Sequence, residues 1–421
     1  MFNKSNLKSD LFKYIVVLMS GTAIAQVLSY LFAPVITRLY TPAEVAELGL
    51  FLRIVGVGAA IATLRYELSL PIPKLEVHAF RLYRFAFRTA LIVALCSLLI
   101  IFIPIGMDLN LDRVLFYVLL PIALLFTAIY NIGTNWSIRK KLFKTISYSK
   151  VVNSLFSGTF KVVFGWIGIG YIGLIVGMVI GIVVSCFWFL RDFLSAQRTY
   201  KISSRSPRNL VLAKEYSEFP RINLPHVLMD LGRDLLVAVL ILKLFTKDDF
   251  GLYDHSYRML RLPLVLAGMA IGQVFFQSCS EKINNKENIV PMLKKSVLTL
   301  TFLSIVPFVV LFFYGEELFA FVFGENWRGA GTFSEIMAPW FLVNFITSPI
   351  STLPMVLRKQ KEFFKLAIVG SLLILGCLTI PPLFYNATII TTLWILSLTQ
   401  ACYLIFVIFK IFDYARKHNA G

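Results

Sequence analysis

Long apolar runs, separated by short polar segments, recur along the whole chain. Runs of about 18 or more apolar residues are long enough to cross a bilayer as helices. There are twelve such runs, and no long polar block between them is left to form a soluble domain. The pattern predicts membrane-spanning helices near residues 14–36, 45–70, 84–105, 114–134, 149–169, 171–191, 219–243, 250–278, 294–314, 332–356, 363–384 and 388–410.

The composition favours the same class of protein. Of the 421 residues, 58% are hydrophobic and 15% are charged, whereas soluble domains have about 25% charged residues. The five cysteines fall inside predicted spans or at the end of one, so they indicate neither a disulfide framework nor a metal site. No loop contains a phosphate-binding glycine motif, a metal-ligand cluster or a Ser-His-Asp spacing. We therefore expect a protein that is not an enzyme and holds no metal or organic cofactor.

The net charge of +18 follows the predicted topology. Of the 41 Lys and Arg residues, 30 fall on the two termini and on the connections of one side, and five fall on the opposite connections. Because basic residues concentrate on the cytoplasmic side of membrane proteins, this bias predicts that both termini are cytoplasmic. The orientation explains the basic charge, and nucleic acid is not an expected partner.

One polar connection occurs twice, 205 residues apart. Residues 38–55 read RLYTPAEVAELGLFLRIV, and residues 243–260 read KLFTKDDFGLYDHSYRML. Six predicted spans separate the copies, so two halves would enter the membrane in the same orientation, as in transporters that bind substrate between parallel repeats. Chance similarity of two helix starts is the alternative. The repeat predicts an N-terminal lobe at 1–194, a cytoplasmic linker at 195–216 and a C-terminal lobe at 217–421.

Ionisable residues inside the predicted spans suggest the kind of substrate. A charge at bilayer depth costs about 2.5–3.5 kcal/mol or more, so such residues usually face a bundle interior or a water-filled cavity. Arginine binds phosphate through two parallel hydrogen bonds and keeps its charge. We therefore predict a positive cavity for a phosphorylated substrate, with structural ion pairs as the alternative. The bases are Arg53, Arg65, Lys161, Arg233, Arg258 and Arg261, and the clearly buried acids are Glu67, Asp230, Asp234 and Asp254.

These acids are also the candidates for coupling transport to H⁺ or Na⁺. Asp230 and Asp234 are the strongest of them, because two carboxylates so close together raise the pKa of one, which makes a proton easier to carry. Tyr66 and Tyr257 are candidates for stacking on sugar rings, although tyrosine is common at membrane interfaces in any case.

The two halves predict two relations between arginines. Arg53 and Arg65 are twelve residues apart in the second span, about 18 Å along a helix, and would mark two depths of one wall. Arg53 and Arg258 are equivalent in the two copies, and we expect them to face each other across one cavity.

Four stretches resemble a known family: GTAIAQVLSYLFAPVITRLYTPAE, TLRYELSLPIPK, EFPRINLPH and GLYDHSYRMLRLPLVLAGMAIGQVFFQ. They resemble the polysaccharide biosynthesis transporters known as Wzx-type flippases of lipid-linked oligosaccharides. That family belongs to the multidrug/oligosaccharidyl-lipid/polysaccharide exporter superfamily, which includes multidrug and toxin extrusion proteins and the lipid II flippase. The resemblance implies an all-α polytopic membrane protein with about 12 transmembrane helices in two six-helix lobes, forming a V-shaped central cavity.

The resemblance also implies a function. Such a flippase moves undecaprenyl-pyrophosphate-linked oligosaccharide repeat units across the bacterial inner membrane, by alternating access and in exchange for a cation. The units would supply the O-antigen of lipopolysaccharide or a capsule, with the polysaccharide polymerase and chain-length machinery as further partners. On matching positions, Arg53, Arg65, Arg258 and Arg261 would face the diphosphate and sugar path. One departure concerns the first outer turn, which has Val45-Ala46 where the family has an aromatic residue and Gly.

Two other classes of function are weighed against this one. A cation-coupled multidrug exporter of the same superfamily is the alternative, but it needs a carboxylate-rich pocket, and the first span offers only Gln26 as a polar group at depth. A membrane glycan polymerase or ligase would be an enzyme. Such enzymes usually carry a large outer loop, which this chain lacks.

Overall fold

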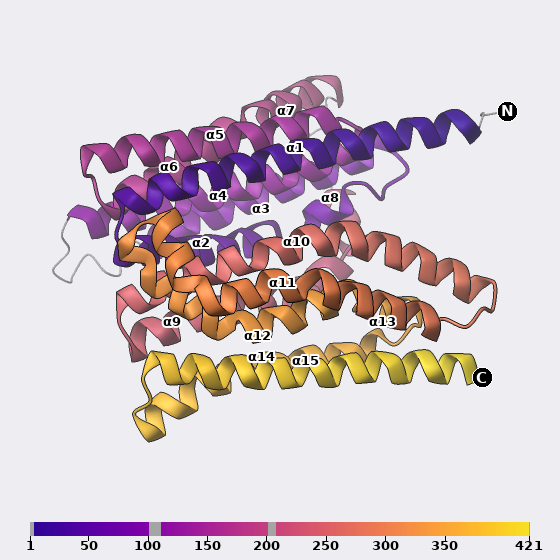
Figure 1. Ribbon diagram of the computed structural model, residues 1–421. Coiled ribbons are helices and arrows are strands. Elements are labelled where there is room, and N and C mark those ends of the chain that lie inside the picture. Colours follow the sequence, from indigo (N-terminus) through magenta and orange to yellow (C-terminus); the bar gives the residue numbers. More distant parts are fainter. Residues whose placement is uncertain (1–3, 101–110, 201–207, 421) are drawn as a thin grey trace. The chain divides into compact units, whose positions relative to one another are not determined.

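The computed structural model describes residues 4–100, 111–200 and 208–420 (Figure 1). The regular structure in these ranges is helical throughout, which confirms the predicted all-α fold. The long helices are α1 (Lys4–Leu39), α2 (Pro42–Thr63), α3 (Glu76–Ile100), α4 (Leu111–Arg139), α5 (Phe143–Ile167), α6 (Tyr171–Ser185), α7 (Phe187–Tyr200), α9 (Leu224–Leu244), α10 (Lys247–Asn284), α11 (Val290–Phe323), α12 (Arg328–Ile350), α14 (Gln360–Tyr385) and α15 (Ile389–Ala420). The short ones are η1 (Tyr66–Ser69), α8 (Arg208–Glu215), the π-helix η3 (Phe219–Asn223), η4 (Glu325–Trp327) and α13 (Leu353–Val356).

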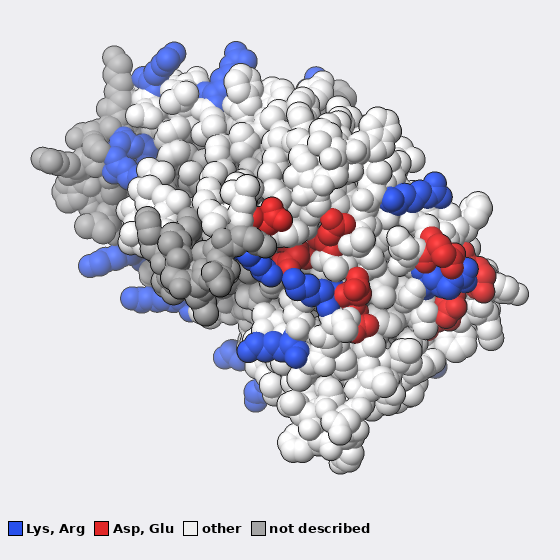
Figure 2. Space-filling model, turned by 90° about the vertical axis from the view of Figure 1, so that its left-hand side faces the viewer, with Lys and Arg blue, Asp and Glu red and all other residues white. Residues whose placement is uncertain are grey.

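Each predicted span overlaps one of these long helices, with α6 and α7 together forming the sixth. Within the described ranges, nine helical segments are long and apolar enough to cross a membrane. Helices α5, α9 and α10 fall outside that set, and they carry the predicted site residues Lys161, Asp230 and Arg261. On the face shown in Figure 2, most of the surface is neither acidic nor basic. The chain is a multi-pass membrane protein.

The chain divides into two compact units. Unit 1 comprises Met1–Tyr40 and Glu47–Leu235, and unit 2 comprises Thr41–Ala46 and Leu236–Gly421. The predicted linker at 195–216 lies within unit 1, and its residues 201–207 fall outside the described part of the chain. The division into lobes at 194 and 217, which was drawn from the membrane spans, stays a prediction.

Unit 1 is built on close contact between helices with small side chains. In its core, an alanine-rich face of α3 packs on α4, and the rings of Tyr83 and Trp136 stack with centroids 5.0 Å apart. Helix α5 lies against α1, where a Cβ on Gly158 would come within 2.2 Å of the Phe32 ring. Small residues at such contacts are typical of helix association in membranes.

Unit 2 is organised around α12. This helix contacts α10, α11 and α15, and most of its side chains are buried. Its close fit to α11 depends on glycine, because a Cβ on Gly331 would lie 2.4 Å from the Gly315 carbonyl oxygen. A polar side chain on α12 therefore faces protein or a cavity in most positions, and not lipid.

The two copies of the repeat have the same local structure and are in contact. Each starts a helix with a threonine whose backbone N–H donates to a carboxylate three residues later, at 2.8 Å for Thr41 and Glu44 and 3.0 Å for Thr246 and Asp249. This capping box satisfies N–H groups that have no partner within the helix. The Ala43 N–H also donates to Asp248 Oδ1 of the second copy at 3.0 Å. Val45-Ala46 leaves this turn intact, since α2 starts normally at Pro42.

The prediction of one helix through residues 45–70 was wrong. Helix α2 ends at Thr63, and Leu64 and Arg65 follow with φ angles of 48° and 61°. This left-handed conformation costs about 1–2 kcal/mol per residue outside glycine, and η1 begins immediately afterwards. Arg65 and Glu67 therefore lie beyond the helix that carries Arg53, and the two arginines do not mark two depths of one helix.

Candidate functional site

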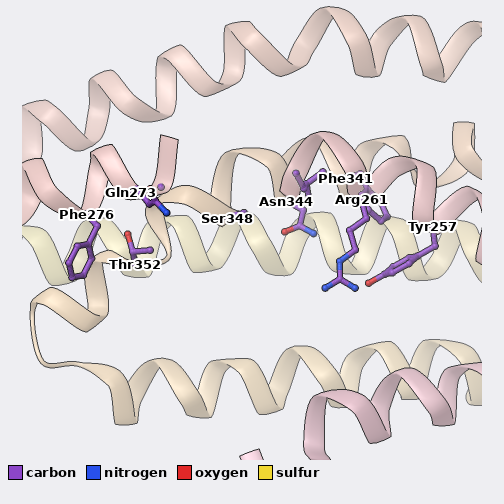
Figure 3. A pocket seen from close by; sticks show the side chains of 10 residues that line it. Tyr257, Arg261, Gln273, Phe276, Phe341, Asn344, Ser348 and Thr352 are labelled. Carbon is purple, nitrogen blue, oxygen red and sulfur yellow. The ribbon is translucent and has the colours of Figure 1, made fainter. Parts of the chain in front are cut away.

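A groove of about 660 Å³ lies between α10 and α12 in unit 2 (Figure 3). Proline occurs within both helices, at Pro263 in α10 and at Pro339 and Pro349 in α12. A proline removes one backbone hydrogen bond and kinks a helix, which favours openings between neighbouring helices. The groove is lined by Tyr257, Arg261, Leu264, Gly272, Gln273, Phe276, Phe341, Asn344, Ser348 and Thr352.

One end of the groove carries a cation. Tyr257 and Arg261 are one helical turn apart on α10, and their polar ends point to the same side as the Asn344 amide from α12 (Figure 3). In the described part of the chain, no carboxylate lies within ion-pair distance of Arg261. Its exposed guanidinium is therefore available to an anion from outside the chain.

The other end is polar but uncharged. Gln273, Phe276 and Thr352 lie there (Figure 3). Gln273 follows Arg261 by twelve residues on α10, which is about 18 Å along the helix axis. The groove thus offers one cation, several amide and hydroxyl groups, and aromatic surface.

The ion-pair alternative holds for Asp254 and Arg258. Asp254 is 1% exposed and bonds to Arg258 one turn later on α10, whose side chain is 38% exposed. A buried carboxylate held in such a pair has its charge already compensated. The roles of Asp254 in cation coupling and of Arg258 in substrate binding stay predictions.

The charged residues Asp230, Arg233 and Asp234 on α9 form a cluster, in which Arg233 contacts both acids. Arg233 contacts Asp234 at 2.9 Å and Asp230 at 3.5 Å, all within unit 1. The Arg233 guanidinium therefore lies between the two carboxylates. Their coupling role stays a prediction.

The residues after α2 hold the segment that leads into α9. Arg65 Nε donates to Asn223 Oδ1 at 3.1 Å, and its Nη1 lies 3.1 Å from Glu67 Oε1. The Tyr66 hydroxyl donates to the Ala213 carbonyl at 2.9 Å, and the ring is 5% exposed. Both the ring and the hydroxyl of Tyr66 are thus used inside unit 1, and its role in stacking on sugar rings stays a prediction.

Arg53 and Lys161 lie in unit 1. Arg53 Nη1 donates to the Gly49 carbonyl at 3.0 Å within α2. Lys161 lines a pocket of about 250 Å³ with both polar and apolar residues, Ser29, Asn153 and Ser157 among them. That Arg53 and Arg258 face each other stays a prediction, since they belong to different units.

Comparison with known families places the chain. The model of the family described as "polysaccharide biosynthesis protein" matches residues 77–331. The chain belongs to this family. No curated protein matches it at a significant level.

Solved structures show what the fold is similar to. The lipid II flippase MurJ, in an inward closed conformation, matches with a TM-score of 0.71 at 15% identity, covering 96% of this chain and 90% of that one. An inward-facing multidrug resistance transporter of the MATE family matches with a TM-score of 0.70 at 13% identity, covering 96% and 98%. A superfamily transporter from Pyrococcus furiosus, with a binding pocket of reverse polarity, matches with a TM-score of 0.53 at 14% identity, covering 97% and 94%. This member of the polysaccharide biosynthesis family thus has the two-lobe fold of flippases and transporters.

Sequence reasoning identified Tyr257 and Arg261 of the groove and missed its other polar residues. Asn344, Ser348 and Thr352 follow one another at intervals of four residues in a predicted span that contains several prolines. That spacing places them on one side of a helix. It is a signal that a search restricted to charged residues overlooks.

Proposed function

We propose that the protein is a flippase for undecaprenyl-pyrophosphate-linked oligosaccharide repeat units. It moves them from the cytoplasmic to the outer leaflet by alternating access, coupled to H⁺ or Na⁺, for assembly of O-antigen or capsule. The observation that supports this most is Arg261, a cation without a carboxylate partner in the described structure, in a groove of amides, hydroxyls and aromatic rings. No covalent chemistry is needed, and the protein is not an enzyme in this proposal.

The groove contains groups that suit each part of such a substrate. A guanidinium can donate two parallel hydrogen bonds to phosphate oxygens, and the Tyr257 hydroxyl can donate to another. The amides and hydroxyls further along suit sugar hydroxyls, which both donate and accept. A cationic drug would find no counter-charge, because none of the ten lining residues is acidic. The groove therefore favours the flippase over the multidrug exporter.

The location and the partners follow from the same proposal. The protein lies in the bacterial inner membrane with both termini cytoplasmic, where 30 of its 41 basic residues would also lie. It delivers its product to the polysaccharide polymerase and chain-length machinery on the outer side. Asp230 and Asp234, which share Arg233, are the first candidates for cation coupling, with Glu67 and Asp254 after them.

The test is the movement of lipid-linked repeat units in cells. Deletion of the gene should abolish surface polysaccharide and leave lipid-diphosphate oligosaccharide facing the cytoplasm. Arg261→Gln should reproduce this defect at normal protein level. The matched control is Arg328→Gln, which removes an outer arginine paired with Glu325 at 2.6 Å and should leave export intact. Normal surface polysaccharide in the deletion strain would refute the proposal.

A further inference from the structure

The groove between α10 and α12 is open along one stripe of an otherwise buried helix. Between residues 341 and 350 of α12, only Leu342, Asn344 and Ser348 are partly exposed, and the other seven are buried. Two of these three open positions are polar and line the groove. The accessible stripe of α12 thus presents two hydrogen-bonding groups, Asn344 and Ser348, to the groove.

The polar groups on this stripe are not used by the protein itself. In the described residues, neither the Asn344 amide nor the Ser348 hydroxyl has a hydrogen-bond partner, and the same holds for the Gln273 amide opposite. Asn344 and Ser348 are partly exposed and Gln273 is exposed, so these groups are open to hydrogen bonds from a ligand that enters the groove. Thr352 differs, because its hydroxyl already donates to the Pro349 carbonyl at 3.0 Å.

Charge is confined to one end of the groove. Of the ten lining residues that the structure describes, only Arg261 is charged, and Gln273 follows it by about 18 Å along α10. Residues 265–270 of α10, whose side chains are not described, are Val, Leu, Ala, Gly, Met and Ala in the sequence and add no charge.

We propose that this groove selects uncharged sugars. Resting on the flippase function proposed above, Arg261 binds the diphosphate, and Gln273, Asn344 and Ser348 bind hydroxyl and acetamido groups of neutral sugar units along unit 2. Amide and hydroxyl groups both donate and accept, so they match sugar hydroxyls in either direction. A carboxylate of an acidic sugar lying at the Gln273 end would be partly desolvated without a cation near it, which is unfavourable. Phe276, 42% exposed at that end, offers an apolar face to the sugar ring.

The test compares two lipids in proteoliposomes that contain the full chain. Both are polyprenyl diphosphates with a trisaccharide; one carries three neutral hexoses, and in the other the hexose furthest from the diphosphate is replaced by a hexuronic acid. The wild-type protein should move the neutral lipid at least about tenfold faster, the loss expected when a charge is left unpaired. Equal rates would overturn the proposal of selectivity and leave the flippase function standing. Failure to move either lipid would refute the flippase function itself.

Variants separate the two ends of the groove. Arg261→Gln should abolish movement of both lipids. Asn344→Ala and Ser348→Ala should each slow the neutral trisaccharide lipid about two- to tenfold, the range for one neutral hydrogen bond, and leave a lipid with a single sugar unaffected. The control Ser371→Ala removes a hydroxyl on α14 that donates to its own helix at Ala367 and should change neither rate. Unchanged rates in both groove variants would contradict the assignment.

A gain of function excludes loss of folding as the explanation. Ser348→Lys places a cation in the neutral part of the groove, at a partly exposed position. It should raise the rate for the hexuronic acid lipid relative to the neutral one, which a misfolded protein cannot do. A fall in both rates at normal protein level would count against the proposal.

Discussion

The contact between the two copies of the repeat can be tested by adding one methyl group to Gly251. A Cβ at this position would lie 1.9 Å from the Pro42 carbonyl oxygen, where ordinary contact begins at 3.4 Å, so the backbone at Pro42 must move by about 1.5 Å. Overpacking of this kind costs about 1–3 kcal/mol. The movement would also stretch the bond from Ala43 N–H to Asp248 Oδ1, and hydrogen bonds to charged groups contribute about 1.5–3 kcal/mol.

Two comparison variants separate these contributions. Asp248→Ala should lose only the hydrogen bond and be less destabilised than Gly251→Ala. Gly232→Ala is the matched control, because nothing lies within 4 Å of a Cβ at that position of α9, and alanine is favoured over glycine in a helix by about 1 kcal/mol. Thermal unfolding of the detergent-purified protein should show a clear fall in Tm for Gly251→Ala and none for Gly232→Ala. If Gly251→Ala and Gly232→Ala had the same Tm, Gly251 would not pack against Pro42 as the structure shows.

Three further changes test other parts of the structure. Tyr257→Asp places an acid one turn before Arg261, so it should pair with that base and abolish export while the protein still accumulates in the membrane, as checked by immunoblot. Tyr66→Phe leaves the buried Ala213 carbonyl without its donor and should destabilise unit 1 by about 1–3 kcal/mol, seen as a lower Tm without altered preference between lipids. An impermeant thiol reagent should label Glu325→Cys in intact cells of a cysteine-free background, because the connection at 324–331 carries few basic residues; labelling only after lysis would reverse the topology.

The helices could be predicted from the sequence because membrane spans require long apolar runs, and the repeat could be recognised because capping boxes have a fixed spacing. The residue at which α2 ends could not be predicted from the sequence. The helix stops at Thr63 although no glycine or proline follows directly, and Leu64 and Arg65 adopt left-handed φ angles. The surrounding contacts, including those of Arg65 and Tyr66 with Asn223 and Ala213, hold this turn. Such contacts join residues about 150 positions apart, which local pattern does not reveal.

The sequence also did not show which of the arginines within the spans would be paired with an acid. Arg258 and Arg261 are both arginines within α10, yet one is paired and the other is available. The difference lies four residues earlier, where Asp254 precedes Arg258 and Tyr257 precedes Arg261. Because residues four apart on a helix are neighbours, an acid at that spacing neutralises a base locally. Arg261 has no such acid before it, and in the described part of the chain no acidic side chain lies within ion-pair distance of it. In the proposed function, the diphosphate of the substrate supplies the counter-charge.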